Sequence, residues 1–497
     1  MPWDEAMTGA SATVELTLVS HTNAGKTTLA RTLLGRDVGE VRDAPHVTEL
    51  AESHVLIETP GGDRLRLWDT PGFGDSARLA KRLRAADNPI GWMLREVWDR
   101  YRDRPLWCSQ QAVRAVRESA DVVLYIVSAA EDPRDAAYVA PEMQVLSWIG
   151  KPVLLLLNQV GPPRPAEEER AEEERWRTVA APFAVVRGVL TLDAFARCWV
   201  QEGSLLERVA PLVPEGKRAA FGRLAAAWRA RGEARFARSL DALVEALMAA
   251  ATDREAIDPA SRPGRAAQLL RSLGFGKDRD KEDGARAQAM AALAARADEG
   301  LRAATDRLIA LHGLEGAAAA TVLARVRENY ATTEPLSEGK AAALGGIVSG
   351  AMTGLAADLA HGGLTLGAGL VTGAIVGALG GAGIARGANL LRGVEGGSVA
   401  WSPAFLDSLV RAALLHYLAV AHFGRGRGAY EAGESPAFWK AEVERAFAAR
   451  GPAFEALWEN LRASPDEAQA AEDLRSLVEE VATQVLERLY PGAMRPA

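Results

Sequence analysis

A short run of residues near the N-terminus has the types and the order that bind phosphate groups. The segment VSHTNAGKTT contains Gly25, Lys26 and Thr27 in direct succession. In such a loop the backbone N–H groups surround the phosphates, the lysine meets the β- and γ-phosphates, and the next hydroxyl binds Mg²⁺. Ser20 departs from this pattern, because a glycine usually stands at the first position. The residues expected to contact a bound nucleotide in this loop are Thr22, Asn23, Ala24, Gly25, Lys26, Thr27 and Thr28.

A second motif, Asp69-Thr70-Pro71-Gly72, follows a run with strand character. An aspartate at the carboxyl end of a strand reaches the Mg²⁺ sphere through water, and the Gly72 N–H can meet a γ-phosphate. Between the two motifs lies Thr48, which would ligate Mg²⁺ only when a γ-phosphate is present. The alternative for Thr48 is an ordinary surface threonine in a loop. We expect catalysis from Lys26, Thr48 and Gly72, and Mg²⁺ ligation by Thr27, Thr48 and Asp69.

These motifs require a sheet that places the ends of several strands beside one another. Strand-like runs alternate with helical stretches, which is typical of a parallel sheet with crossover helices. We therefore predict an α/β P-loop NTPase domain, the G domain, with a doubly wound and mostly parallel sheet. Its expected strands are Val14–Val19, His54–Glu58, Leu65–Trp68, Val122–Val127, Val153–Leu157 and Phe183–Val186, with helices at Thr27–Leu34 and Ala166–Arg177.

The two motifs together resemble those of the translation-factor-like GTPases, most closely the Era-like group, over roughly residues 12–200. The similarity lies at Asn23, Gly25, Lys26, Thr27 and Thr48 and in the motif from Asp69 to Gly72. It implies a protein that binds GTP and Mg²⁺, with Asn23 helping to hold K⁺ beside the phosphates. Phe73 stands where Ras-like enzymes carry the glutamine that orients water. Because a phenyl ring cannot exchange a proton, hydrolysis should be slow unless a cation or a partner positions the water.

The motif that reads guanine in the related GTPases is incomplete in this chain. The run Val153–Leu157 ends in Asn158-Gln159-Val160-Gly161, where the family pattern is Asn-Lys-x-Asp. The family's aspartate accepts two hydrogen bonds from guanine, and Gly161 has no side chain to do so. Loss of such a polar pair relaxes base selectivity. Asn158 is either a nucleotide contact or a cap of the strand end, and the family's serine-alanine-lysine signature is absent around residues 185–188.

Beyond residue 203 the strand pattern gives way to helical spacing. Residues 341–385 contain one formal charge, Asp358, and glycines at four-residue intervals. This spacing lets helices approach closely, as small residues do within membranes. We predict a Gly/Ala-rich helical hairpin that either packs in a soluble domain or contacts a membrane, and that can join copies into a homo-oligomer. The expected parts of the chain are the G domain at 1–202, followed by an all-α region with a helical domain at 203–335, the hairpin at 336–396 and a C-terminal helical region at 397–497.

Composition and charge limit the kinds of partner and the cellular compartment that the sequence predicts. The 497 residues suit two or three domains, and the formal charge of −7 gives no overall attraction to nucleic acid. Acidic residues interleave a set of arginines, so we expect a solvated helix face there and no nucleic-acid partner. The set comprises Arg223, Arg229, Arg231, Arg235 and Arg238. Cys108 and Cys198 form no metal motif and, with an N-terminus unlike a signal peptide, indicate a cytoplasmic protein, at the cytoplasmic membrane if the hairpin inserts.

Most of the chain also resembles a bacterial family. The segment TEPLSEGKAAALGGIVSGAMTGL and its continuation, after an Era-like G domain, resemble the bacterial GTPases that carry domain of unknown function 3482. The resemblance implies that the altered residues after Asn158 are a family trait. We expect a GTP-binding protein with slow, partner- or cation-activated hydrolysis that acts as a switch for the helical region. The alternative is a non-hydrolysing scaffold that assembles on a membrane or a partner protein.

Overall fold

The chain is described by a computed structural model and divides into two compact units. The described residues are 11–35, 51–85, 88–91, 103–161, 163–195, 198–256, 280–314, 391–394, 398–401, 403–423, 436–463 and 466–492. The first unit comprises Met1–Arg235, Ala421–Ala429 and Leu486–Ala497, and the second comprises Phe236–Val420 and Tyr430–Val485. Thr48 and residues 341–385 of the predicted hairpin lie outside the described residues.

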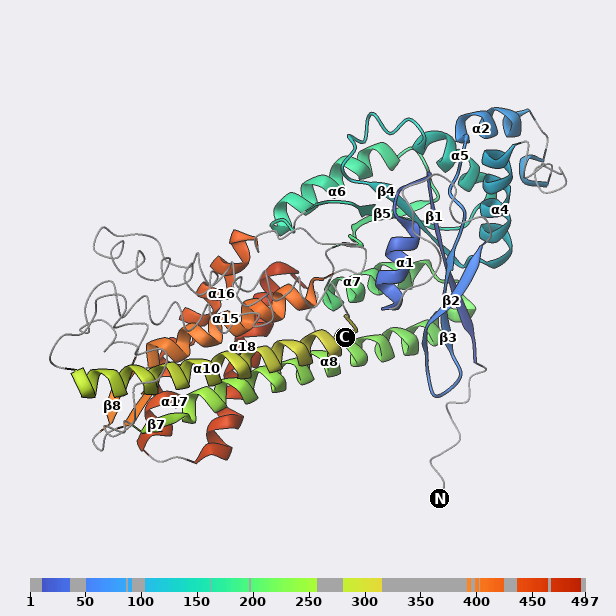
Figure 1. The fold of residues 1–497 in the computed structure, drawn as a ribbon. Coiled ribbons are helices and arrows are strands. Elements are labelled where there is room, and N and C mark those ends of the chain that lie inside the picture. Colours follow the sequence, from blue (N-terminus) through green and yellow to red (C-terminus); the bar gives the residue numbers. More distant parts are fainter. Residues whose placement is uncertain are drawn as a thin grey trace, which may run out of the picture. The chain divides into compact units, whose positions relative to one another are not determined.

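A six-stranded sheet forms the centre of the first unit (Figure 1). Its strands are β1 (Thr13–Ser20), β2 (Glu52–Glu58), β3 (Arg64–Asp69), β4 (Val122–Ser128), β5 (Val153–Asn158) and β6 (Val186–Thr191). They lie in the order β2-β3-β1-β4-β5-β6, and every pair is parallel except β2 with β3. The chain passes from β1 to β2 and β3 on one side of β1 and then crosses to β4 on the other side. The carboxyl end of β1 is therefore a topological switch point, where α/β sheets bind ligands. The doubly wound, mostly parallel fold is confirmed.

Helices cover both faces of this sheet because successive strand side chains point to opposite faces. In β4, Val123, Tyr125 and Val127 join one hydrophobic core, and Val122, Leu124 and Ile126 join the other. The first core receives side chains from α2 (Ser76–Arg84), α4 (Arg104–Ser119), α5 (Val139–Ile149) and α6 (Ala166–Ala180). The second receives them from α1 (Lys26–Leu34), α7 (Trp199–Val209) and the first part of α8 (Arg218–Thr252).

Five of the six predicted strands are confirmed, as are the predicted helices at α1 and α6. The sixth prediction, Phe183–Val186, is wrong, because β6 begins only at Val186. The Phe183 N–H donates to the Ala180 carbonyl, and the Val186 N–H donates to the Phe183 carbonyl. Phe183 to Val186 is therefore a turn after α6. The apolar side chains that suggested a strand pack against the core from this turn.

The arginines of the first half of α8 bind groups of the first unit rather than forming only a solvated face. The Arg223 guanidinium pairs with the buried Asp63 carboxylate at 2.7 and 3.1 Å. This pairing holds the pKa of Asp63 below its ordinary value. Arg231 lies 4.1 Å over the Trp228 ring and donates to a backbone carbonyl of β2. Arg223 and Arg231 therefore have partners within the first unit.

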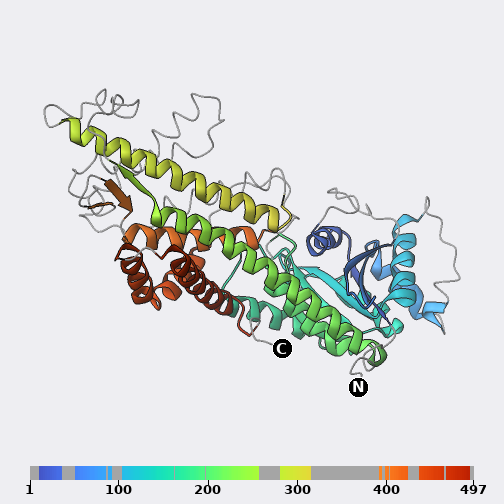
Figure 2. The same cartoon turned by 90° about the horizontal axis from the view of Figure 1, so that it is seen from below.

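The second unit is mainly helical. Besides the rest of α8 it contains α10 (Asp280–Leu311), most of α15 (Pro403–Ala421), α16 (Ala437–Ala448), α17 (Gly451–Ala463) and most of α18 (Glu467–Leu489). Helices α8 and α10 run antiparallel side by side (Figure 2), joined by the ion pairs Arg296–Asp253 and Arg307–Glu245. The predicted helices of the C-terminal region are confirmed. A small antiparallel sheet, unexpected from the sequence, consists of β7 (Arg254–Ala256), β9 (Ser398–Trp401) and β8 (Leu391–Val394).

Short 3₁₀ helices at Ala210–Leu212 and Glu215–Lys217 occupy the break between α7 and α8. Of the described helices, α15 is long and apolar enough to cross a membrane, and 67% of its apolar window is buried within the protein. Both cysteines, Cys108 and Cys198, are thiols buried in the first unit.

Candidate functional site

The loop between β1 and α1 has the backbone of an anion-binding loop. Asn23 and Gly25 have positive φ angles of 65° and 86°, which asparagine and glycine adopt more readily than other residues. Helix α1 begins directly afterwards at Lys26, and no described side chain caps its N-terminus. The positive end of the α1 helix dipole therefore faces the loop, where it favours a negatively charged ligand.

Lys26 folds back onto this loop. Its Nζ donates to the Ser20 hydroxyl at 2.8 Å and to the His21 carbonyl at 3.4 Å, and its side chain is almost fully buried. Burial lowers the pKa of Lys26, while the negative charge of Asp69 opposes the shift. Ser20, which breaks the expected glycine pattern, thus supplies the lysine with a partner. A bound phosphate would add the negative charge that favours the ammonium form.

Thr27 and Asp69 form the pair expected of a Mg²⁺ site. The Thr27 hydroxyl donates to Asp69 Oδ2 at 2.6 Å. The other carboxylate oxygen, Oδ1, is buried and has no hydrogen-bond partner among the described residues. Burial raises the pKa of Asp69, and the hydrogen bond from Thr27 opposes this. An adjacent hydroxyl and an unsatisfied carboxylate oxygen are the hard oxygen donors that Mg²⁺ prefers, so these residues fit the ion.

Gly72 is the point at which the second motif meets the first. A Cβ atom added to Gly72 would lie 3.1 Å from Lys26 Nζ and 3.1 Å from Thr22 Cα. The next residue pairs with the loop, because the Phe73 N–H donates to the Ser20 carbonyl and its own carbonyl accepts from the Thr22 N–H. The Phe73 ring is fully buried in the core. It is therefore unavailable for orienting a water molecule.

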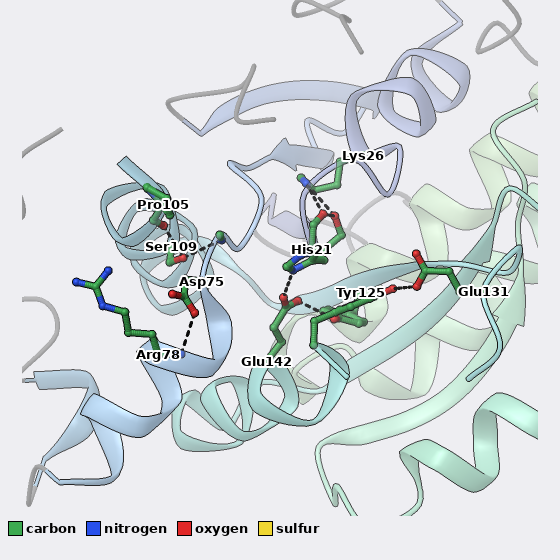
Figure 3. Close-up of polar contacts among 12 residues, drawn as sticks. His21, Lys26, Asp75, Arg78, Pro105, Ser109, Tyr125, Glu131 and Glu142 are labelled. Carbon is green, nitrogen blue, oxygen red and sulfur yellow. Dashed lines mark hydrogen bonds and ion pairs between the residues drawn. The ribbon is translucent and has the colours of Figure 1, made fainter. Parts of the chain in front are cut away.

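A buried carboxylate links the loop to the segment after Gly72 (Figure 3). Glu142 of α5 is fully buried, with Oε1 2.7 Å from His21 Nδ1 and Oε2 accepting from the Tyr125 hydroxyl at 2.7 Å. The Ser76 side chain, at the start of α2, also hydrogen-bonds this carboxylate. Burial raises the pKa of Glu142, and these hydrogen bonds oppose the shift. The His21 ring stacks on Tyr138 at 4.5 Å. We call this set, centred on Glu142, the Glu142 hub.

Sequence reasoning missed the Glu142 hub. Glu142 is the only charged residue in the sequence of α5, VAPEMQVLSWI, and Tyr125 carries the only polar group within the buried body of β4 before Ser128. A lone charge in an apolar helix beside a lone hydroxyl in an apolar strand was the available signal. Neither residue belongs to a motif, so only the tertiary structure brings them to His21.

The start of α2 is anchored to α4 beside this hub (Figure 3). The Ser109 hydroxyl accepts from the Gly74 N–H at 3.1 Å and donates to the Pro105 carbonyl at 2.8 Å. A Cβ on Gly74 would lie only 2.5 Å from the Pro105 Cβ. Asp75 then caps α2 by accepting from the Arg78 N–H. The segment that follows Gly72 is thus held closely to its surroundings.

Asn158 joins two loops. Its Nδ2 donates to the Ala24 carbonyl at 2.9 Å, and its Oδ1 accepts from the Ala194 N–H at 2.9 Å. The side chain is fully buried. Asn158 therefore does more than cap the end of β5, because it fixes the phosphate-binding loop to the loop after β6. That second loop comprises Leu192 to Phe195. It lies later in the chain than residues 185–188, where the sequence predicts it, because β6 ends at Thr191 and the predicted sixth strand ends at Val186.

The predicted site residues thus gather at the carboxyl ends of β1, β3 and β5. Gly72 lies beside Lys26 and Thr22. Asp69 contacts Thr27, and Asn158 reaches Ala24. Thr48 lies outside the described residues. Among the described residues, no cluster of three or more His, Cys, Asp or Glu side chains could hold a metal ion. The contact between Thr27 and Asp69 makes this pair the candidate position for Mg²⁺.

The chain is similar to known GTPases over this region. Residues 15–159 match the family described as 50S ribosome-binding GTPase. Era in complex with MgGDPNP and a 16S ribosomal RNA segment is 16% identical, with 61% of this chain and 90% of that chain covered and a TM-score of 0.30. An Aquifex aeolicus Era variant bound to GDP and AlF₄⁻ is 15% identical, with coverages of 61% and 98% and a TM-score of 0.30. These TM-scores are low, so the fold assignment rests on the strand order and the family match.

The remainder of the chain matches a second family. Residues 184–490 match the domain of unknown function DUF3482. No curated protein matches the chain. The family match covers more than half of the sequence and follows a GTPase domain, as the resemblance in the sequence implied. The chain belongs to the family of proteins that carry the domain DUF3482, and its residues 15–159 match a GTPase family.

Proposed function

We propose that the protein binds GTP with Mg²⁺ at the carboxyl end of β1 and hydrolyses the nucleotide slowly. The observation that carries this proposal is the meeting of Lys26, Gly72 and the Thr27–Asp69 pair around one loop. Thr22 to Thr28 would bind the phosphates, and Lys26 would stabilise the charge of the transferring phosphoryl group. Mg²⁺, when bound, neutralises charge on the β- and γ-phosphates. Thr27 and Asp69 would hold it, together with Thr48.

In this proposal the rate of hydrolysis depends on a group other than Phe73 that positions the attacking water. The Phe73 ring is buried and carries no proton to exchange. A monovalent cation beside Asn23, a partner protein or both would therefore be needed to position water. We propose K⁺ for the cation, since Asn23 stands where potassium-activated relatives have their asparagine.

The nucleotide state would act on the rest of the chain as a switch. Loss of the γ-phosphate would release the contacts of Gly72 and Thr48. The helical region would respond by changing its exposure, its pairing with another copy or its contact with a membrane through residues 341–385. Flotation with lipid vesicles, with and without nucleotide, tests the membrane contact; no flotation in either state would contradict it.

Turnover measurements test the enzymatic proposal. GTP and ATP hydrolysis would be compared in K⁺ and in Na⁺ for the wild type and for Lys26→Ala. We expect GTP turnover that rises with K⁺ and that falls at least ~100-fold in the variant. Lys217→Ala is the matched control, because Lys217 also pairs with an aspartate, Asp121, but lies outside the loop. GTP binding without Lys26-dependent turnover in either salt would favour the non-hydrolysing scaffold.

A further inference from the structure

We propose that Glu142 is a positioning residue for the γ-phosphate, because it ties the start of the phosphate-binding loop to the segment that follows Gly72. The inference rests on the proposed function and adds to it a means of distinguishing a nucleoside triphosphate from a diphosphate. Glu142 would act through His21 and Ser76 rather than on the phosphate itself.

On the loop side, Glu142 holds a residue that is a partner of Lys26. Glu142 Oε1 lies 2.7 Å from His21 Nδ1. The His21 carbonyl accepts from Lys26 Nζ at 3.4 Å, and the hydroxyl of the neighbouring Ser20 accepts from the same nitrogen at 2.8 Å. The His21 ring is also held by its stack on Tyr138. The position of the Lys26 ammonium group therefore depends on where His21 and Ser20 lie.

On the other side, Glu142 holds the chain four residues after Gly72. The buried Ser76 side chain, at the start of α2, donates its hydroxyl hydrogen to the carboxylate. Between these two positions, the Gly74 N–H donates to the Ser109 hydroxyl of α4 at 3.1 Å. The segment that begins at Gly72 is therefore attached at two further points, and Glu142 provides the one that also reaches the phosphate-binding loop.

The surroundings of the carboxylate fix it in place. Glu142 is fully buried, and its second oxygen accepts from the Tyr125 hydroxyl of β4 at 2.7 Å. A buried carboxylate is unfavourable unless hydrogen bonds compensate for the lost water. Its position is consequently coupled to the positions of His21, Tyr125 and Ser76. The phosphate-binding loop, β4 and α2 thus meet at one side chain of α5 (Figure 3).

This connection concerns the γ-phosphate more than the other phosphates. GDP would be held by the amides of the loop and by the start of α1. GTP would add contacts from Lys26 and from the Gly72 N–H to the γ-phosphate. Because both groups meet one phosphate, the two segments must lie at a fixed separation. Segments already held by Glu142 need no further ordering when GTP binds. Loss of the connection should therefore weaken GTP binding more than GDP binding.

Equilibrium binding of GDP and of a non-hydrolysable GTP analogue to the full chain, with Mg²⁺ present, tests the inference. We expect Glu142→Ala to lower the ratio of the affinity for the analogue to the affinity for GDP at least ~10-fold, about the effect of one hydrogen bond to a charged group. Ser76→Ala removes only the connection to α2 and should lower the ratio at least ~3-fold. A general loss of stability would lower both affinities and leave the ratio constant.

Ser147→Ala is the matched control for the loss of a serine hydroxyl. Ser147 lies on α5, and its hydroxyl donates to the Met143 carbonyl of the same helix at 2.7 Å. The affinity ratio of this variant should equal that of the wild type. If Glu142→Ala fails to fold, the comparison of Ser76→Ala with Ser147→Ala decides: a lowered ratio in Ser76→Ala alone supports the connection, and equal ratios contradict it.

A double variant shows whether Ser76 acts through Glu142. In Glu142→Ala/Ser76→Ala the affinity ratio should equal that of Glu142→Ala alone, because the Ser76 hydroxyl has already lost its acceptor. Additive decreases would overturn the inference, since Ser76 would then act by another route. A lowered ratio in Glu142→Ala with an unchanged ratio in Ser76→Ala would also overturn it, because the carboxylate would then act on the loop alone.

The same measurements separate this inference from the proposed function. Equal losses of affinity for the two nucleotides in Glu142→Ala, or an unchanged ratio, would overturn the role of Glu142. Either result would leave Lys26-dependent turnover, and hence the proposed function, intact. Absence of any nucleotide binding by the wild type would overturn both proposals.

Discussion

The phosphate end and the base end of the candidate site are built in different ways. At the phosphate end the backbone forms the site: positive φ angles at Asn23 and Gly25, the uncapped start of α1 and the close approach of Gly72. At the other end, a side chain makes the connection, because the buried amide of Asn158 joins the phosphate-binding loop to the loop after β6. The backbone arrangement depends on glycines at fixed positions in one short segment. The Asn158 contacts depend instead on three segments that only the fold brings together.

The largest effect should come from breaking the backbone at the phosphate end. Gly25→Ala places a Cβ 2.5 Å from Asn158 Nδ2 at a φ of 86°, so we expect a loss of about 3 kcal/mol or more in unfolding free energy. Chemical denaturation measures it. Gly35→Ala is the control, because Gly35 also has a positive φ but no atom near its Cβ, and it should cost only ~1 kcal/mol. Equal losses of unfolding free energy in the two variants would mean that backbone strain alone, and not the contact with Asn158, lowers the stability of Gly25→Ala.

Removing the connection between the two ends should have the next largest effect. Asn158→Ala leaves the Ala24 carbonyl and the Ala194 N–H without their partner in a buried setting, which should cost about 2–4 kcal/mol. The same unfolding experiment on Asn88→Ala, an exposed asparagine that accepts from a local N–H, should show a change near ~0.5 kcal/mol. If the two variants behave alike, the ends are not held together by Asn158.

The stability contributed by the Glu142 hub should depend on pH. Burial raises the folded-state pKa of Glu142. A carboxyl with a raised folded pKa contributes stability that is fully present below the unfolded pKa and is lost as pH rises through the folded pKa. We expect Glu142→Gln to gain stability relative to the wild type as pH increases from 4.5 to 8. The same comparison in a His21→Gln background shows whether the gain depends on the imidazole that contacts Glu142. A difference in unfolding free energy that does not change with pH in either background would contradict the expectation.

The smallest effect should come from Gly161. Gly161→Ala introduces a side chain into open space at a φ of 89°, at a cost of ~1 kcal/mol of stability. Because only the backbone of Gly161 is available for the site, the GTP:ATP affinity ratio should change by no more than about twofold. Titration of the variant with fluorescent GTP and with fluorescent ATP measures the ratio. A tenfold change would show that the segment after Val160 reads the base directly.

The sequence predicted the phosphate end well, because local residues determine it. The apolar run of β1, the glycine before Lys26 and the strand ending in Asp69 each carry their own signal. The sixth strand was misplaced because Phe183–Val186 has β-branched and aromatic residues but forms a turn, whereas β6 contains Gly188 and a register irregularity. The contacts of Glu142 depend on three elements distant in sequence, which no local pattern reports.

The position of the two cysteines has a practical consequence. Cys108 lies on α4 and Cys198 directly before α7, both fully buried in the first unit, and the sequence contains no other cysteine. A thiol reagent therefore reports the opening of the first unit alone, while unfolding confined to the second unit gives no signal. A ligand that binds the folded GTPase domain stabilises it by mass action. Protection of these thiols would consequently measure nucleotide affinity without a label on the nucleotide.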